Sequence, residues 1–547
     1  MAFYVLFALL ALCTGQTVSP TTSPSPSPSC SALPGYFCSS GSVLICPIGA
    51  YCAGGSALNV SCYPVTACTV LGLSAQPPCY WNVSTLAGSG SASFANGFGL
   101  AASFSCPVGL ISVDNTLLVA DSLNNRIRAV TQSGLVSTFS GSGVGSYIDG
   151  SSATAAFSRP YFIAQNGTFS FLVADLLNNY IRAVSSTGTV STVAGNGLGS
   201  FTDHVNPLAA SFNTPSGIAV DSIGNIFVAD SANNRIRLLT SAGVATFAGS
   251  SIPGSLNGVG TAATFNFPTD VIVDRSRNVY VCDMNNHRLR KITPTGTVTS
   301  FAGAGVAGWA DGASTSARFN QPYRAALDSL ENLFVGDEVN NRIRMVDPTG
   351  FVRTIAGTGA PAWADGFGLM AMFRDPTGVA INAVGALQVA DCSNNRIRQL
   401  TCVPCPASYY CFSGAPVLCP AGSYCPLSSI NSTFCPKGSF SNAGASSCTL
   451  CPAGTFTSTT GSLSCQQCPG GHYCPPGTSS WARLNCGRGN YCSDGSGALT
   501  PCPYQVPPSG GWGALQVQGP AFLVETARCL NHCFWNFTSG DGMLSKC

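Results

Sequence analysis

Short apolar runs alternate with clusters of turn-forming residues through the middle of the chain. In one stretch the runs cover residues 217–221, 225–230, 235–239 and 243–248, and residues such as Gly, Ser and Asn separate them. Apolar runs of this length between turn signals predict four successive β-strands. A unit of four short strands favours a β-propeller, in which each unit forms one blade.

The four-strand unit recurs along the chain, and three sequence markers give its period. The first is an Asp ahead of an Asn pair and an Arg-x-Arg, the second is Ala-x-Phe, and the third is Asn or Asp followed by Gly, seven residues before the Phe. One copy of the third marker departs and is Asp203-His204. Six sets of markers predict six blades. The first marker falls at Asp121, Asp175, Asp230, Asp283, Asp337 and Asp391, which are 53 to 55 residues apart.

The two ends of the repeat region predict how the ring closes. A fourth-strand pattern stands alone at 83–88, ahead of the first full unit, and the last unit has only three strands, ending near Leu400. We expect the first strand to complete the last blade, which leaves no unpaired sheet edge. The propeller is therefore predicted to span residues 81–401.

The repeated polar residues suit a structural role, because each occurs once per blade and one chemical event seldom needs six copies of a residue. Asn tolerates the left-handed backbone of tight turns, and an Asp carboxylate can accept backbone N–H groups across such a turn. Arg126 and Arg128 share one face of a strand, since they are two residues apart. We expect the repeated Arg residues to pair with the Asp residues or to lie over neighbouring strands.

Positions where the repeat changes are better candidates for binding. Tyr180 and His287 are interpreted as replacing the first Arg of the Arg-x-Arg, while His204, Trp309 and Trp363 stand in the Gly-rich connectors between blades. Connectors on one propeller face form the usual binding surface, and Trp and Tyr suit contact with protein or sugar rings. These five residues form the candidate ligand-binding surface. The alternative is that the aromatic side chains simply fill the packing of the connectors.

The segment from residue 119 to residue 128, with Ala-Asp ahead of Asn-Asn-Arg-Ile-Arg and a following Gly-rich strand, resembles the NHL repeat family. The resemblance covers about residues 82–401, well over half of the chain. It implies an all-β fold, a six-bladed β-propeller of NHL type, used mainly for binding. A few related propellers are enzymes, so a metal-dependent lyase or lactonase is the alternative function.

The residues offer little to that alternative. A lyase of this kind needs several His around a metal, and only His204 and His287 lie in the propeller, at non-equivalent positions. A lactonase-like site needs acidic residues that converge on calcium, and the propeller contains only Glu331 and Glu338 as glutamates. We therefore expect a binding protein with no cofactor, and leave open a structural calcium ion in the central channel.

The charge balance argues against a nucleic-acid partner. Charged residues make up 8% of the chain, with a formal net charge of +2. Between residues 82 and 401, eighteen Arg and one Lys balance seventeen Asp and two Glu. Binding to phosphate needs a basic stripe, which this balance does not provide. The expected partner is a protein or a glycan.

Cysteine-rich flanks at 30–80 and 402–547 surround the repeats. Their recurring Cys-Pro-x-Gly-x-Tyr-Cys, at residues 46–52, 419–425 and 468–474, resembles the cysteine-rich repeats of ephrin-receptor-like ectodomains. Such small modules need disulfides, because they lack an adequate apolar core. Zinc held by C-x-x-C pairs is the weaker alternative. Within the propeller, Cys106 or Cys392 is expected to link to a flank, and Cys282 is the candidate for a buried free thiol.

The N-terminus and the sequons point to the secretory pathway. An apolar run within residues 1–15 is typical of a signal peptide, and a Ser/Pro-rich spacer follows at 16–29. The 28 cysteines imply an oxidising compartment. We expect an extracellular or cell-surface glycoprotein with no membrane span in this chain, although a downstream anchor is left open. The N-glycosylation candidates are Asn59, Asn82, Asn166, Asn431 and Asn536.

Overall fold

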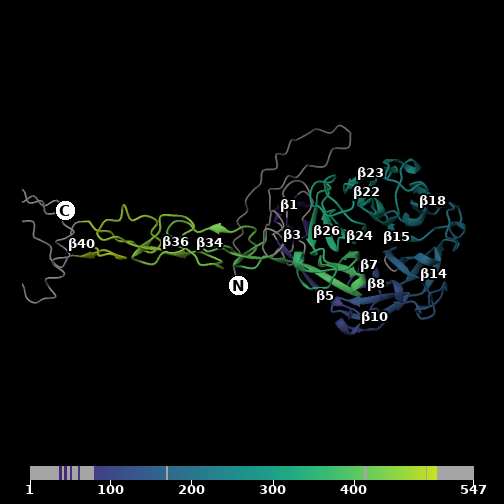
Figure 1. The fold of residues 1–547 in the computed structure, drawn as a ribbon, viewed down its shortest axis with the longest axis horizontal. Helices are drawn as coiled ribbons and strands as arrows, with labels where there is room; N and C mark the ends of the chain where they lie inside the picture. The colour runs from purple at the N-terminus through teal and green to yellow at the C-terminus, as the bar shows by residue number, and fades with distance from the viewer. Residues whose placement is uncertain are drawn as a thin grey trace, which may run out of the picture.

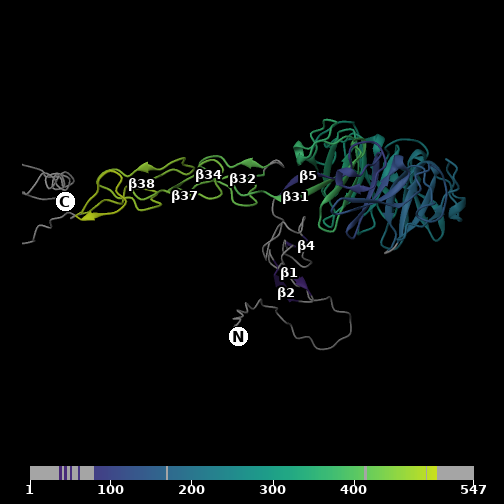
Figure 2. The ribbon, with the colours of Figure 1, turned by 90° about the horizontal axis from the view of Figure 1, so that it is seen from below.

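The computed structural model describes residues 36–39, 42–45, 50–51, 60–61, 79–167, 170–411, 416–487 and 490–501. Most of the described residues form a ring of β-sheets and a narrow rod that leads away from it (Figure 1). The rod continues from the chain that leaves the ring at β31, beside β5 (Figure 2). The predicted signal peptide, the spacer and most of the module at 30–80 lie outside the described residues.

The ring is a six-bladed all-β propeller, as the repeat predicts. Each blade is an antiparallel sheet whose strands run in order from the axis outward, and three blades gain a short fifth strand at the outer edge. Blades one to three are β7 (Pro107–Val113), β8 (Thr116–Asp121), β9 (Arg126–Thr131) and β10 (Leu135–Ser140); β11 (Pro160–Gln165), β12 (Ser170–Asp175), β13 (Tyr180–Ser185) and β14 (Val190–Ala194); and β15 (Pro215–Val220), β16 (Ile226–Asp230), β17 (Arg235–Thr240) and β18 (Gly243–Ala248).

Blades four and five follow the same plan, and blade six takes its outer strand from the start of the repeat region. One-turn 3-10 helices occupy five of the six Asp turns and four of the connectors. The remaining strands are β20 (Pro268–Val273), β21 (Val279–Asp283), β22 (Arg288–Ile292) and β23 (Thr297–Ala302); β24 (Pro322–Leu327), β25 (Leu333–Asp337), β26 (Arg342–Val346) and β27 (Val352–Ala356); β29 (Pro376–Ile381), β30 (Leu387–Asp391), β31 (Arg396–Pro404) and β5 (Cys79–Ala87); and the edge strands β6 (Gly97–Phe98), β19 (Gly258–Val259) and β28 (Gly366–Phe367). The 3-10 turns are η2 (Gly99–Ala101), η3 (Ser122–Asn124), η4 (Leu176–Asn178), η5 (Pro207–Ala209), η6 (Ser231–Asn233), η7 (Gly260–Ala262), η8 (Met284–Asn286), η9 (Gly368–Met370) and η10 (Cys392–Asn394).

The ring closes through β5, and this confirms the closure predicted from the sequence. β5 pairs with β31 in antiparallel register, with Val83 opposite Leu400, and the order of this blade is β29-β30-β31-β5. A disulfide adds to the seam, because Cys106, just before β7, bonds to Cys392 in η10. The expectation that one of these two cysteines links the propeller to a flank is therefore wrong. The error arose because Cys106 and Cys392 are 286 residues apart in sequence but adjacent once the ring closes.

The buried apolar residues lie between successive blades. The Phe of the Ala-x-Phe marker is fully buried in all six copies, and Phe104 packs with Leu110 of blade one and Ile397 of blade six. Burial of such a side chain contributes about 1.5–3 kcal/mol. Each copy of the Ala-x-Phe marker therefore joins two blades.

Near the axis, glycines let the innermost strands approach closely, and a Cβ on Gly378 would lie 2.0 Å from the Val108 carbonyl oxygen.

The rod consists of small hairpins that are linked to their neighbours. Each module donates a backbone hydrogen bond to a later one, as from Gly422 to Ser441 and from Gly438 to Thr457. Disulfides within modules replace an apolar core. The two cysteines of a C-x-x-C pair form disulfides with different partners, so they do not serve as zinc ligands. The described pairs are Cys405–Cys411, Cys419–Cys425, Cys435–Cys448, Cys451–Cys465, Cys468–Cys474 and Cys486–Cys492. The hairpin strands are β32 (Tyr409–Tyr410) to β41 (Thr500–Pro501), and β1 (Tyr36–Ser39) to β4 (Val60–Ser61) lie in the N-terminal flank.

The described part of the chain contains no helix that is long and apolar enough to cross a bilayer.

Candidate binding surface on the connector face

The Asp turn of each blade is built around a buried ion pair. Asp121 is fully buried and accepts hydrogen bonds from the Ser105 backbone N–H (2.8 Å), Asn124 Nδ2 (2.9 Å) and Arg128 Nη1 (2.7 Å). Burial is the largest influence on these carboxyls, and it raises the pKa of Asp175 to about 6. The expected Arg–Asp pairing is confirmed in all six blades, as Arg128–Asp121, Arg182–Asp175, Arg237–Asp230, Arg290–Asp283, Arg344–Asp337 and Arg398–Asp391.

The same arginine ties the connector to the blade. Arg182 also binds Asp149 of the connector (Nη2 to Oδ1, 2.5 Å), and Asp149 accepts a second bond from the Thr192 backbone N–H. The connector carboxylate is about 40% exposed, unlike the turn carboxylate. Blades one and four use Asn96 and Asn257 in its place. We call the surface formed by the connectors and the Asp turns the connector face.

The second residue of the Asn pair links each blade to the next. Asn125 adopts left-handed backbone (φ 54°), and its Oδ1 accepts from the Arg159 backbone N–H of blade two. His287 takes this place in blade four, where its Nδ1 accepts from the Gln321 N–H at 3.2 Å. The interpretation of His287 as a replacement for the first Arg is therefore wrong. Asn285 and Asn286 resemble the pair in sequence, but the turn is shifted by one residue and Arg288 begins the strand.

Aromatic side chains recur on the connectors, two residues before the Asp or Asn that binds the buried arginine. Each ring is 39–51% exposed and covers the first residue of the third strand. Trp309 lies over the Arg342 guanidinium (4.2 Å from its ring centroid), and its Nε1 donates to Thr354 Oγ1. Trp363 lies over Arg396 in the same way. The full set, which we call the aromatic ladder, is Phe94, Tyr147, Phe201, Trp309 and Trp363.

Tyr180 lies beneath one ring of the aromatic ladder and supports it. It stands where other blades have the first Arg, and its ring stacks on Tyr147 with centroids 4.3 Å apart. Its other side faces Gly197, where an added Cβ would lie 2.7 Å from the Tyr180 hydroxyl. Tyr180 is thus half-buried, and its exposed neighbour is Tyr147.

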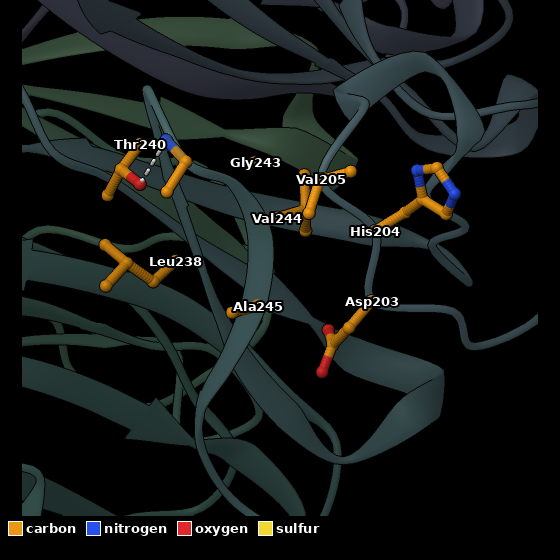
Figure 3. Close-up of a pocket in the computed structure, with 9 residues that line it drawn as sticks. Asp203, His204, Val205, Leu238, Thr240, Gly243, Val244 and Ala245 are labelled. Carbon is orange, nitrogen blue, oxygen red and sulfur yellow. Dashed lines mark hydrogen bonds between the residues drawn. The ribbon is translucent and has the colours of Figure 1, made fainter.

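His204 lines an open depression of about 460 Å³ at the outer edge of blade three (Figure 3). It replaces the connector Gly, and one extra residue lets the chain turn here without the left-handed backbone that Gly150 and Gly312 adopt. The Asn206 backbone N–H donates to His204 Nδ1 (2.9 Å), so the ring is held against its own loop. Val205, with 78% exposure, is the most exposed large apolar residue of the described chain.

The central channel holds a charged pair that sequence reasoning missed. Arg324 of β24 and Asp270 of β20 are both fully buried, 3.3 Å apart, and Arg324 also lies over the Phe162 ring. Burial raises the pKa of Asp270 to about 6. Tyr161 and Tyr323, from opposite blades, meet through their hydroxyls beside this pair. A comparison of the inner strands by register would have found it, since Gly109, Gly217 and Gly378 occupy the position of Asp270 in other blades.

Metal-binding clusters of three or more His, Cys, Asp or Glu are absent from the described residues. Cys282 of β21 is buried and is the free cysteine among them, which confirms that prediction. Of the glycosylation candidates, Asn431 is exposed, Asn82 and Asn166 are half-buried, and Asn59 and Asn536 lie outside the described residues.

The structure brings the five predicted surface residues to different places. Trp309 and Trp363 share one role, Tyr180 supports a ladder ring, His204 lines its own depression, and His287 joins two blades. Phe94, Tyr147 and Phe201 were missed, although their constant spacing from the connector Asp or Asn is visible in the sequence.

Comparison with known proteins supports both parts of the chain. The NHL repeat family matches residues 212–237 and 265–292, and the family described as tyrosine-protein kinase ephrin type A/B receptor-like matches residues 438–486. Protein SUPPRESSOR OF QUENCHING 1, chloroplastic, from Arabidopsis thaliana is 28% identical over 47% of this chain and 26% of its own length. NHL repeat-containing protein 2 from Bos taurus is 29% identical over 45% of this chain and 39% of its own length.

A solved structure shows the same fold. A structural genomics protein of unknown function from Bacteroides thetaiotaomicron superposes with a TM-score of 0.50 at 19% identity, over 67% of this chain and 89% of its own. The curated relatives are matched over less than half of their own length. The chain therefore contains NHL repeats within a six-bladed β-propeller, and the rod that follows contains a segment similar to the ephrin-receptor-like family.

Proposed function

We propose that this chain is an extracellular or cell-surface binding protein, in which the connector face of the propeller recognises a protein or glycan ligand and the disulfide rod serves as a spacer. The aromatic ladder is the observation that carries the proposal. Five rings stand at equivalent positions around one face, each half-exposed and each held by an arginine or a tyrosine.

Exposed apolar side chains accompany the ladder. Val144, Leu198, Ile252 and Val306, each three residues before the ladder position, are 57–69% exposed. Soluble proteins seldom leave so many large apolar groups on one surface unless a ligand covers them. Rings that are held in place lose little conformational entropy on binding, and this favours their use as contact residues.

The disulfides support the proposed location. Seven described bridges, one of them at the propeller seam, are typical of proteins from an oxidising compartment. The predicted signal peptide and sequons agree with secretion, and glycosylation at Asn431 suits its exposed position on the rod.

Binding of the purified, labelled chain to a glycan array and to intact cells tests the proposal. The double variant Trp309→Ser, Trp363→Ser should lose most of the binding, and the fold should tolerate it because Ser255 stands naturally at the equivalent position of blade four. Ile223→Ser is the matched control, since Ile223 is 66% exposed in the turn between β15 and β16, on the other face. Equal binding by both variants would contradict the proposal.

A further inference from the structure

The aromatic ladder has one vacant position, in blade four. Ser255 stands where the other connectors have a ring, and Arg288 beneath it has no aromatic ring over its guanidinium among the described residues. The connector is nonetheless in the same register. The Leu256 carbonyl and Asn257 Oδ1 each accept from Arg290 Nη2 at 2.9 Å, as the Ala95 carbonyl and Asn96 accept from Arg128 in blade one.

The guanidinium of Arg288 keeps one of the two contacts made at the complete positions, because its Nη1 donates to Ser300 Oγ instead of to a turn carbonyl. Arg288 Nη2 donates to the Ala304 carbonyl (3.0 Å), and Gly305 backs the guanidinium so closely that an added Cβ would lie 1.7 Å from Nη2. The Nη2 contact is shared with Arg342, which donates to the Thr358 carbonyl and is backed by Gly359. In blade five Trp309 covers the outer side of that arginine, whereas in blade four that side lacks a ring.

We propose that the vacant position binds an aromatic side chain, Trp, Tyr or Phe, of a partner protein. This inference names the partner chemistry of the connector face and rests on the proposed function. The negative face of an aromatic ring complements the positive guanidinium of Arg288. The connector also supplies exposed apolar contacts from Ile252 (69%) and Leu256 (67%).

A sugar ring suits this position less well than an aromatic side chain. It has no π face to place over a cation, and blade four offers no aromatic platform of its own on which a sugar could stack. The chain itself provides the template, because four of its own blades place an aromatic ring over arginine at the equivalent position.

The test uses the full chain and N-acetyl-5-fluorotryptophan amide as the probe, followed by ¹⁹F relaxation. Ser255→Phe lets the chain fill its own vacancy, so it should abolish probe binding while keeping or raising the unfolding temperature. Arg288→Gln should weaken binding about two- to fivefold, since an exposed cation–π contact is worth about 0.5–1 kcal/mol. Phe201→Ser opens a second vacancy over Arg235 and should add a second binding site.

Probe binding that Ser255→Phe leaves unchanged would overturn the inference, and so would a failure of Phe201→Ser to add a site. If Ser255→Phe lost binding to a glycan but still bound the probe, the ligand at this position would be a sugar and not a protein side chain. Self-association that Ser255→Phe abolishes in sedimentation would replace the protein partner with a second copy of this chain. Because Trp309 and Trp363 are untouched here, failure of this inference and failure of the proposed function are distinguishable.

Discussion

His287 Nδ1 accepts a hydrogen bond from the Gln321 backbone N–H, 3.2 Å away, across the boundary between blades four and five. An amide oxygen of Asn makes this contact at the other described boundaries, and an amide oxygen does not titrate. A protonated imidazole cannot accept a hydrogen bond at Nδ1. The junction of these two blades is therefore the one that depends on pH through its linking side chain.

His287→Asn is expected to make the propeller less sensitive to acid. Burial lowers the pKa of His287 below its ordinary 6.5, so the unfolded chain binds a proton that the folded chain refuses. Stability should then fall as the pH drops below about 6.5 in the wild type. Thermal unfolding at pH 7.5 and 5.5 should show a smaller difference in Tm for the variant. An equal difference in both proteins would show that His287 does not control this junction.

Asp230→Asn and Asp203→Asn form a matched pair. Asp230 is fully buried against Arg237, so removal of its charge leaves a buried cation and should cost about 3–5 kcal/mol. Asp203 contacts the same arginine but is 38% exposed, and blades one and four already carry Asn at its position. Its replacement should cost less than about 1 kcal/mol. Denaturant unfolding of the two variants measures the difference, and similar losses would refute this assignment.

Asp270 should contribute to the pH dependence of stability with the opposite sign to His287, and Asp270→Asn should remove its contribution. The pKa of Asp270 is raised from 3.8 to about 6, so between these values the folded chain holds a proton that the unfolded chain releases. Stability should decline as the pH rises through this range, by roughly 3 kcal/mol for this group. The variant should lose that part of the slope, as judged by unfolding at pH 4, 5, 6 and 7. A retained slope would mean that other carboxyls are responsible.

The double variant Cys106→Ser, Cys392→Ser should loosen the seam between blades six and one. Removal of a disulfide that closes a long loop costs about 2–5 kcal/mol, although β5 still pairs with β31. Thermal unfolding should show a lower Tm, with the strand content by circular dichroism unchanged at 25 °C. Mass spectrometry of the non-reduced wild type should find the two cysteines in one linked peptide pair, and their absence from it would contradict the seam.

The sequence predicted the parts of this fold that repeat. Strand number, blade number and the role of β5 followed from markers that recur every 53 to 55 residues, because each copy occupies the same environment. Contacts that occur once were not predictable in this way. Asp270 and Arg324 occupy the same register position of two neighbouring inner strands, so only a comparison of those strands with each other, and none of the recurring markers, points to the pair.

Local resemblance also misled in one place. Asn285-Asn286 has the letters of the Asn pair, but the backbone places left-handed geometry at His287, one residue later. The spacing from Asp283 to that residue, the same as from Asp121 to Asn125, was the better guide. Only the two Trp residues of the aromatic ladder were predicted. Phe and Tyr at the same spacing resemble ordinary core residues in the sequence.

The pairing of β5 with β31 also decides how the molecule responds to tension. Cys79 lies opposite Pro404, so the two flanking segments leave the propeller at the same end of this strand pair. A pull between the two flanks would act on the last residue pair of β5 and β31 and would break their hydrogen bonds one at a time. This needs far less force than sliding two strands past each other. The Cys106–Cys392 bond lies beyond that strand pair, and it would stop the opening before the remaining blades separate.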